Sequence, residues 1–258
     1  MLDAMGRVGF GVDIGGTGIK AGRVDLDTGE LIGDRLRMPT PSPATPGQVA
    51  AVVDELVVRH QWSGPIGLCL PAVVRHGIVR TAANIDHSWI GTDAVSLFGE
   101  ATGREVTVIN DADAAGSAEM TWGAGRDRSG VVICLTFGTG IGSGMFVDGV
   151  LVPNTELGHL EIDGSDAERR AAAKVRERED LTWEQWASRV ERYLRHVAFL
   201  FSPDLLILGG GVSKKPNKWL PYLLEGWDDR ECDVVVAEAA NNAGIAGAAL
   251  YAPASASE

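Results

Sequence analysis

Four residues, Gly-Thr-Gly-Ile, occur twice in this sequence, at positions 16–19 and 138–141. Each copy follows an apolar run typical of a β-strand and precedes a second apolar run, with Gly22 and Gly144 at matching offsets. Glycine lets the backbone take a positive φ and approach a ligand closely, and successive N–H groups in such turns make a concave site for anions. The duplication therefore predicts two phosphate-binding turns, one in each half of the chain, that close on one phosphate-bearing ligand between them.

Other interpretations of these turns are weaker. A single glycine-rich hairpin turn is usually only a turn, but two copies with matching flanks favour phosphate binding. Neither copy ends in the Gly-Lys-Ser/Thr of a Walker loop. Glycine occupies every second position from 138 to 144, as in a strand turn, which argues against the Gly-x-Gly-x-x-Gly of a dinucleotide-binding Rossmann unit.

The elements that must position these turns alternate between strands and helices in both halves. In the first half, strands are expected at residues 8–14, 19–25, 31–38, 66–70 and 106–109. In the second half, they are expected at residues 131–137, 143–147, 150–152, 205–208 and 233–236. Helices are expected at residues 47–57, 97–103, 112–122, 165–180, 183–201 and 244–251. This alternation indicates the α/β class.

Composition limits the class of partner and compartment. The chain has 258 residues, 45% of them hydrophobic, and a net charge of −12, so nucleic acid and anionic membranes are not expected partners. Cys69, Cys134 and Cys232 are too far apart for a Cys-x-x-Cys pair. Because Cys69 and Cys134 lie in apolar runs, we expect them to be buried thiols in a reducing compartment. Because no signal peptide or membrane-spanning stretch is visible, the sequence predicts a cytoplasmic protein.

Several segments together resemble one known family. Residues 13–20 resemble the first phosphate motif of the actin-like sugar kinases, residues 136–144 the second, and residues 208–213 the adenosine motif. Residues 156–159, Glu-Leu-Gly-His, resemble the sugar-binding segment of the ROK family (repressors, ORFs, kinases). The resemblance covers nearly the whole chain, with the motifs in the right order.

Three further segments, residues 84–91, 158–164 and 181–186, resemble the branch of this family that phosphorylates glucose with inorganic polyphosphate. A typical ROK protein has a zinc site of clustered cysteines shortly after the histidine of the sugar segment. This chain has no cysteine between Cys134 and Cys232. The departure fits the polyphosphate branch, and we expect no zinc.

The resemblance implies an actin-like ATPase (ribonuclease H-like) fold of two lobes, each a mixed sheet with helices. Residues 1–109, with a C-terminal helix at 241–252, would form the small lobe with the first phosphate motif. Residues 110–240 would form the large lobe with the catalytic aspartate, the second phosphate motif and the sugar segment.

Asp111 is the candidate general base, since phosphoryl transfer needs a carboxylate beside the attacking hydroxyl and little covalent help. It follows the strand expected at 106–109, and the family's catalytic aspartate lies in the same Asn-Asp pair. The competing role is an N-cap of the next helix, which Asp113 could fill instead.

The resemblance also implies which residues bind the sugar. Asn110, Glu156 and His159 would hydrogen-bond its hydroxyls together with Asp111. Asn84 is expected to touch the sugar, although an Asn that only forms a turn is nearly as good an account. Glu168 follows the missing cysteines and is a candidate, with a solvated helix face as its equal rival.

The donor side is expected to combine a metal with glycine turns and lysines. Asp13 would orient Mg²⁺ through water, its alternative being a polar strand residue that needs a partner. Lys214, Lys215 and Lys218, taken as the only basic cluster of the chain, could follow a polyanion or form a solvated loop. The residues expected to contact phosphate are Gly15, Gly16, Thr17, Gly18, Lys20, Thr136, Gly138, Thr139, Gly140, Gly210, Gly211, Lys214, Lys215 and Lys218.

The predicted activity is transfer of a terminal phosphoryl group from inorganic polyphosphate to the 6-hydroxyl of glucose by a Mg²⁺-dependent homodimer. ATP as the donor is the alternative, and the use of mannose stays open. A sugar-sensing ROK repressor is disfavoured because the first phosphate motif begins near Phe10 and leaves no room for a DNA-binding helix pair. A non-catalytic actin-like protein is disfavoured by the candidate sugar site.

Overall fold

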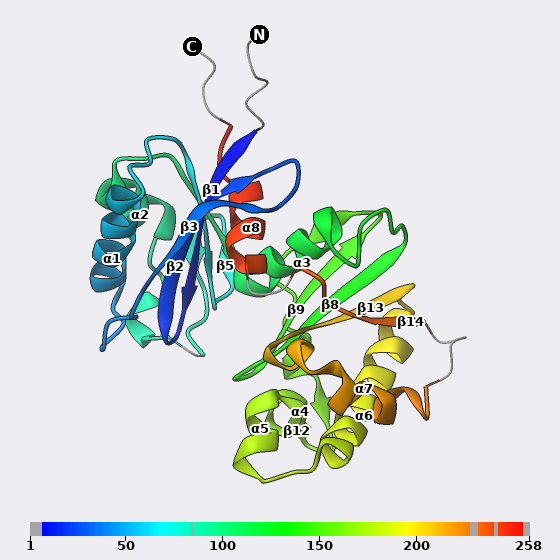
Figure 1. Cartoon of the computed structure of the whole chain (residues 1–258). Helices are drawn as coiled ribbons and strands as arrows, with labels where there is room; N and C mark the ends of the chain where they lie inside the picture. The colour runs from blue at the N-terminus through cyan, green and yellow to red at the C-terminus, as the bar shows by residue number, and fades with distance from the viewer. Residues whose placement is uncertain (1–6, 84, 228–231, 240–241, 255–258) are drawn as a thin grey trace. The chain divides into compact units, whose positions relative to one another are not determined.

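The computed structural model describes residues 7–83, 85–227, 232–239 and 242–254 (Figure 1). Asn84, one of the expected sugar contacts, lies outside these residues. The chain divides into two compact units: unit 1 contains residues 1–118 and 241–258, and unit 2 contains residues 119–240. Helix α3 (Asp111–Trp122) crosses the boundary, so Asp111 belongs to unit 1.

Unit 1 is built on a mixed sheet with the strand order β3-β2-β1-β4-β7. The first three strands along the chain are antiparallel neighbours, whereas β4 and β7 continue the sheet in parallel with β1. Parallel neighbours require crossovers, which the helices α1 and α2 supply. The elements are β1 (Val8–Gly15), β2 (Gly18–Asp25), β3 (Leu31–Met38), α1 (Pro46–Arg59), β4 (Ile66–Leu70), β5 (Val74–Arg75), β6 (Ile78–Val79), the 3-10 helix η1 (His87–Trp89), α2 (Ala94–Thr102) and β7 (Val106–Asn110).

Different helices cover the two faces of this sheet. Phe10 and Val12 point to one face, where they join the buried residues of α1 and α2 in one core. Helix α8 (Ala243–Leu250) packs on β1 and β4 (Figure 1). A Cβ added to Gly11 would lie 1.9 Å from the carbonyl oxygen of Ile245, so only glycine lets α8 approach this closely. The sequence expectation of a closing helix of small residues is confirmed.

Unit 2 repeats the plan with the strand order β10-β9-β8-β13-β14. β8, β9 and β10 are antiparallel neighbours, and β13 and β14 run parallel to β8. The mixed sheets confirm the predicted α/β class and the duplicated strand–turn–strand unit. The elements are β8 (Val131–Phe137), β9 (Ile141–Val147), β10 (Val150–Val152), η2 (Leu157–His159), β11 (Glu161–Ile162), β12 (Ser165–Asp166), α4 (Glu168–Ala171), α5 (Ala173–Arg178), α6 (Trp183–Phe201), β13 (Leu205–Gly210), η3 (Gly211–Lys214), η4 (Pro216–Lys218), α7 (Leu220–Leu224) and β14 (Asp233–Val236).

Helix α6 begins at the predicted capping box. The Thr182 hydroxyl accepts from the backbone of Gln185, and the Gln185 side chain accepts from the backbone of Thr182. On its buried face, the ring of Trp186 lies edge-on to Phe137 at 5.8 Å and to Trp219 at 5.7 Å between centroids. This aromatic core ties β8 to the segment that follows β13.

The charged helix predicted over residues 165–180 is wrong. Ser165 and Asp166 form a strand, and the remaining residues form two short helices separated at Ala172, whose ψ of 152° is extended. The Nε1–H of Trp186 donates to the carbonyl oxygens of Ala171 and Ala172, at 3.0 and 3.3 Å. Ala172 is the extended N-cap residue of α5, and its carbonyl oxygen also accepts from the backbone N–H of Val175 at 3.0 Å.

A buried carboxylate holds the end of unit 2 together. Glu119, only 4% exposed, accepts from the backbone N–H groups of Ala124, Glu238 and Ala239 at distances of 2.7 to 3.0 Å. It therefore fixes the segment after β14 onto the last turn of α3. Charge-assisted bonds of this kind are among the stronger ones in proteins.

Glu119→Gln should lower the free energy of unfolding by about 2 kcal/mol, because in either amide orientation an NH₂ group faces a backbone N–H. Urea denaturation followed by circular dichroism measures the change. Glu177→Gln, at an exposed residue of α5, is the control and should change stability by less than about 0.5 kcal/mol. Equal stability of the two variants would contradict a structural role for Glu119.

The three cysteines are buried and free, which confirms the prediction for Cys69 and Cys134 and adds Cys232. Burial raises the pKa of the Cys134 thiol, and the negative charge of Glu119 acts in the same direction. Among the described residues, no helix has both the length and the apolar character needed to cross a membrane.

Candidate active site

The first glycine-rich turn joins β1 to β2 and brings the side chains of Asp13 and Lys20 together. Its register places Asp13 opposite Lys20, and the Lys20 ammonium donates to the Asp13 carboxylate at 2.7 Å. Both side chains are largely buried, with 18% of Asp13 and 28% of Lys20 exposed. The carboxylate in the apolar strand therefore has the partner that its burial requires. Lys20, a predicted phosphate contact, is engaged with Asp13 in this structure.

Gly16 and Gly138 leave open space at the two turns, and neither residue has a left-handed backbone conformation. Neither Gly16 nor Gly138 has a positive φ, and an added Cβ at either position would meet no atom within 4 Å. The proposed use of positive φ in these turns is wrong. Gly18 has a different reason, because an added Cβ would lie 2.5 Å from Nε of Arg37, whose guanidinium donates to the carbonyl of Thr17 at 2.8 Å.

Asp13 and Asp111 approach the same buried residue at the carboxyl ends of the parallel strands. Asp13 pairs in register with Cys69 of β4, and Cys69 with Ile109 of β7, one residue before the Asn-Asp pair. Burial raises the pKa of the Cys69 thiol well above its usual range, and the charges of Asp13 and Asp111 raise it further. Ligand sites in open α/β sheets lie at such strand ends.

Asn110 performs the capping role that was considered for Asp111. Its carboxamide oxygen accepts from the N–H groups of Ala112 at 2.7 Å and Asp113 at 3.1 Å, and its amide donates to Ala72 at 3.2 Å. Asp111 is the first residue of α3 and is half-buried. The N-terminal end of a helix carries partial positive charge, so α3 stabilises negative charge at this position. Direct sugar binding by Asn110 stays a prediction, and most of its hydrogen-bonding capacity is already used.

In unit 2, the second glycine-rich turn lies against Glu168. The Glu168 carboxylate accepts from the backbone of Ile141 at 3.2 Å, and a Cβ on Gly140 would lie 2.3 Å from it. Lys174 at the start of α5 donates its backbone N–H to the carbonyl of Gly138 at 3.1 Å. The turn is thus flanked by Glu168, which was a candidate from the sequence, and by the exposed Lys174, which was not.

The sugar segment is placed by a close backbone approach. A Cβ on Gly158 would lie 2.2 Å from the carbonyl oxygen of Ile141, so the segment touches β9 only because this residue is glycine. Buried Ser143 of β9 accepts from the backbone of Leu157 at 3.0 Å and fixes the same segment. Glu156 and His159, on either side of this contact, therefore lie beside the second glycine turn.

Glu156, His159 and Glu168, three predicted sugar contacts, lie close together, and their binding of a sugar stays a prediction. Nε2 of His159 lies 3.8 Å from Oε2 of Glu156, and a ligand atom of His159 lies within 4.8 Å of one from Glu168. Burial raises the pKa of Glu156; His159 opposes the shift, and the like charge of Glu168 reinforces it. Carboxylates and an imidazole grouped in this way can accept and donate hydrogen bonds to several hydroxyls at once.

Gly210, a predicted donor contact of unit 2, lies beside the second turn. Gly210 has φ of 86° and pairs with Phe137, the residue before Gly138. A Cβ on Gly210 would lie 2.3 Å from the carbonyl oxygen of Phe137, so glycine is required there. The following Gly211 is exposed, and an added Cβ would meet no atom within 4 Å.

The three lysines are exposed: Lys214 ends η3, Lys215 lies between the two 3-10 helices, and Lys218 ends η4. Within the described ranges none of them forms an ion pair. The segment that carries Lys214, Lys215 and Lys218 is held by Trp219, whose indole N–H donates to Val212 at 3.1 Å. Their charges are therefore available to an anion.

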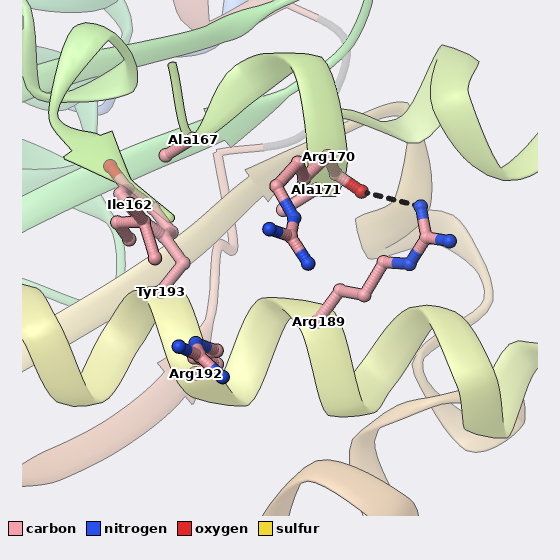
Figure 2. Close-up of a pocket in the computed structure, with 7 residues that line it drawn as sticks. All are labelled: Ile162, Ala167, Arg170, Ala171, Arg189, Arg192 and Tyr193. Atoms are coloured by element: carbon pink, nitrogen blue, oxygen red, sulfur yellow. Dashed lines mark hydrogen bonds between the residues drawn. The ribbon is translucent and has the colours of Figure 1, made fainter. Parts of the chain in front are cut away.

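The expectation that these lysines form the only basic cluster is wrong. Figure 2 shows Arg170, Arg189 and Arg192 around a cavity of about 30 Å³ between α4 and α6. These arginines differ from the lysines because each is paired with a carboxylate. Asp163 pairs with Arg170 and Arg192, and Glu179 pairs with Arg189.

The donor sets fit magnesium better than a structural zinc. Asp13 offers a partly exposed hard oxygen, and Mg²⁺ is commonly held by one or two carboxylates together with substrate phosphates. Among the described residues, one group could hold a metal, formed by His159, Asp166 and Glu168. It contains no thiolate, whereas structural zinc sites usually contain several.

Purified protein should accordingly contain no stoichiometric zinc, while activity should require Mg²⁺. Elemental analysis after dialysis, paired with an assay across a magnesium titration, measures both. One tightly bound zinc per chain would contradict this account of the missing cysteines.

The chain is similar in sequence and in fold to known proteins. The model of the ROK family matches residues 9–169. A polyphosphate glucokinase of Mycobacterium tuberculosis (strain H37Rv) is 53% identical over 95% of this chain and 91% of its own length. The crystal structure of an inorganic polyphosphate/ATP-glucomannokinase from Arthrobacter sp. strain KM superposes with a TM-score of 0.88 at 49% identity, covering 94% of this chain and 97% of the other. A ROK hexokinase from Thermus thermophilus gives 0.76 at 28% identity, covering 95% and 98%.

Proposed function

Because this chain belongs to the ROK family and has its actin-like ATPase fold, we propose that it transfers the terminal phosphoryl group of inorganic polyphosphate to the 6-hydroxyl of glucose. The observation that carries the proposal is the grouping of Glu156, His159 and Glu168 beside the second glycine turn. A group of hydroxyl-binding residues and a phosphate-binding turn are the two parts that a sugar kinase needs. The 53% identity to a polyphosphate glucokinase supports the choice of substrates.

In the proposed reaction, Asp111 accepts the proton of the 6-hydroxyl as its oxygen bonds to the terminal phosphorus. The bond to the next phosphate breaks, and the polyphosphate leaves one unit shorter. Asp111 acts at the N-terminus of α3, while Glu156, His159 and Glu168 bind the other hydroxyls. Asp13 would hold a Mg²⁺ ion through water, and that ion would supply positive charge to neutralise the phosphates of the donor.

The glycine turns and lysines bind the donor in this proposal. In unit 1 we assign this role to the turn at residues 15–18 and to Lys20. In unit 2 we assign it to the turn at residues 136–140, to Gly210 and Gly211, and to the three lysines. Arg37 and Lys174, which touch the two turns through Thr17 and Gly138, are added to the predicted contacts.

ATP is the second candidate donor, and mannose a second candidate acceptor. The glucomannokinase from Arthrobacter is described as using inorganic polyphosphate or ATP, and residues 208–213 resemble an adenosine motif. We further propose a cytoplasmic protein, which the three buried free thiols support, and a homodimer, which rests on the family resemblance.

Phosphorus NMR of a mixture of glucose, polyphosphate, Mg²⁺ and enzyme tests the proposal. We expect a phosphate monoester on the 6-oxygen of glucose to accumulate with time. Absence of any sugar phosphate with either polyphosphate or ATP would overturn the proposed function.

A further inference from the structure

We propose that Asp166 is a positioning residue that holds the imidazole of His159 in the orientation and tautomer needed to bind the sugar. The inference rests on the proposed function, because His159 is taken as a sugar contact. Asp166 lies outside every motif that the sequence comparison with the family singled out. Its role is inferred from the contacts of one small hairpin in unit 2.

The two ring nitrogens of His159 face different carboxylates. Nδ1 lies 3.2 Å from Oδ2 of Asp166, within hydrogen-bond range, whereas Nε2 lies 3.8 Å from Oε2 of Glu156, which is too long for a hydrogen bond. A carboxylate can only accept, so the contact with Asp166 selects the tautomer with the proton on Nδ1. The lone pair of Nε2 is then left to accept a hydrogen bond from a sugar hydroxyl, next to the Glu156 carboxylate.

The backbone that carries Asp166 is held by its own hairpin. Asp166 pairs with Glu161 across β11 and β12, and the connecting residues Asp163 and Gly164 both have positive φ, 54° and 72°. Such two-residue turns match the twist of an antiparallel pair and fix its register. The N–H of Ala167 donates to Leu160 at 2.9 Å and closes the base of the hairpin.

The tip of the hairpin is clamped from two helices. The Asp163 carboxylate pairs with Arg170 of α4 at 2.9 Å and with Arg192 of α6. Figure 2 shows these two arginines on facing elements, with Ile162 of the hairpin beside them. The clamp therefore links α6, a 19-residue helix with a buried apolar face, to the hairpin. Through Asp166 the hairpin in turn reaches the imidazole of His159.

A bound cation is the competing account of this cluster. His159, Asp166 and Glu168 offer ligand atoms within 4.8 Å of one another, so a metal could also orient the ring. A metal is unnecessary for this purpose, because the hydrogen bond between Nδ1 of His159 and Oδ2 of Asp166, at 3.2 Å, already fixes the orientation of the ring. The two accounts differ in their response to chelation.

The test combines kinetics with NMR of the histidine ring. Asp166→Ala should raise KM for glucose about tenfold, with a smaller change in kcat and no change in KM for polyphosphate. Asp166→Asn, which can still accept from Nδ1–H through its amide oxygen, should recover part of the loss. Glu161→Ala, an exposed residue opposite Asp166 on the same hairpin, is the matched control and should behave as the parent protein.

Nitrogen NMR is feasible because the chain has only five histidines, and His159→Gln identifies the signal. We expect the parent to show the proton on Nδ1 and Asp166→Ala to show a shift toward Nε2. An unchanged tautomer in Asp166→Ala, or an unchanged KM for glucose, would overturn the proposal. In a second test, the parent protein is treated with a chelator and magnesium is then restored for the assay. If this treatment raises KM for glucose as much as Asp166→Ala does, a bound metal orients the ring and the proposal is overturned.

The tautomer measurement needs no turnover, so it separates this proposal from the proposed function. A parent protein that phosphorylates no sugar would refute the function, while the ring of His159 would still report whether Asp166 orients it. Asp166→Asn also protects the test against misfolding of the alanine variant, because it keeps the size and polarity of the side chain.

Discussion

Asp111→Asn should lower kcat by at least ~100-fold, the range typical for removal of a general base. The amide keeps the shape of the side chain but cannot accept the proton of the sugar hydroxyl. Since Asn110 already caps α3, the substitution should leave the helix start intact. Glucose binding, measured by isothermal titration calorimetry, should be largely kept, so the loss should fall on turnover.

Two comparisons make this result specific. Asp127→Asn, at a side chain that is 93% exposed, removes the same charge and should leave kcat unchanged. The melting temperature of Asp111→Asn should stay close to that of the parent protein. Near-normal turnover in Asp111→Asn would contradict its role as the base and leave it as a residue of the first helical turn.

The second large effect is expected from the three lysines. Changing Lys214, Lys215 and Lys218 together to Ala should raise KM for polyphosphate by about tenfold or more, while KM for glucose barely moves. The chain has a net charge of −12, so a polyanion must be met by local positive charge. The lysines are exposed, so the effect should shrink as ionic strength rises.

A matched control separates local contacts from net charge. Changing Arg7, Arg126 and Arg128 to Ala removes the same number of charges at exposed positions outside the predicted donor site. This variant should show a much smaller change in KM for polyphosphate. If both triple variants respond equally, or if the lysine variant uses polyphosphate as well as the parent at low salt, the lysines form a solvated loop and the donor lies elsewhere.

Parts of this structure could be predicted because they depend on local rules. The two glycine turns lie between antiparallel strands, as their flanking apolar runs indicate. The Thr182 capping box begins α6 where the sequence placed it. The pair of Asp13 and Lys20 was also accessible, since a two-residue turn at 16 and 17 places these residues opposite each other on the two strands.

Other parts depend on contacts between segments that no local pattern encodes. The run of charges over residues 165–180 is compatible with a single helix. At the observed break, the indole of Trp186, which is distant in sequence, donates to the carbonyls of Ala171 and Ala172. Asp166 contacts His159 because a hairpin places it there. The Asp-Gly pair at residues 163 and 164 is a sequence signal for that hairpin, and it was overlooked. The capping role of Asn110 needed the position of the strand end relative to α3, which sequence spacing leaves uncertain by a residue or two.

Residues of the proposed site that lie in family motifs could be predicted from the sequence, whereas those outside such motifs could not. The Glu-Leu-Gly-His segment and Glu168 were identified from the family resemblance, and the structure places them together beside the second glycine turn. Arg37 and Lys174 were missed because they touch the turns from β3 and α5, elements that carry no recognisable motif. Their contacts are with backbone carbonyls, which sequence patterns do not reveal.

The most direct measurement of the central claim is kcat/KM for polyphosphate and for ATP, determined side by side with glucose and Mg²⁺ on the same enzyme preparation. The account predicts that glucose is phosphorylated at its 6-hydroxyl and that polyphosphate is the better donor. A higher kcat/KM for ATP would make the protein an ATP-dependent ROK hexokinase, and the absence of phosphorylation with polyphosphate would contradict the account.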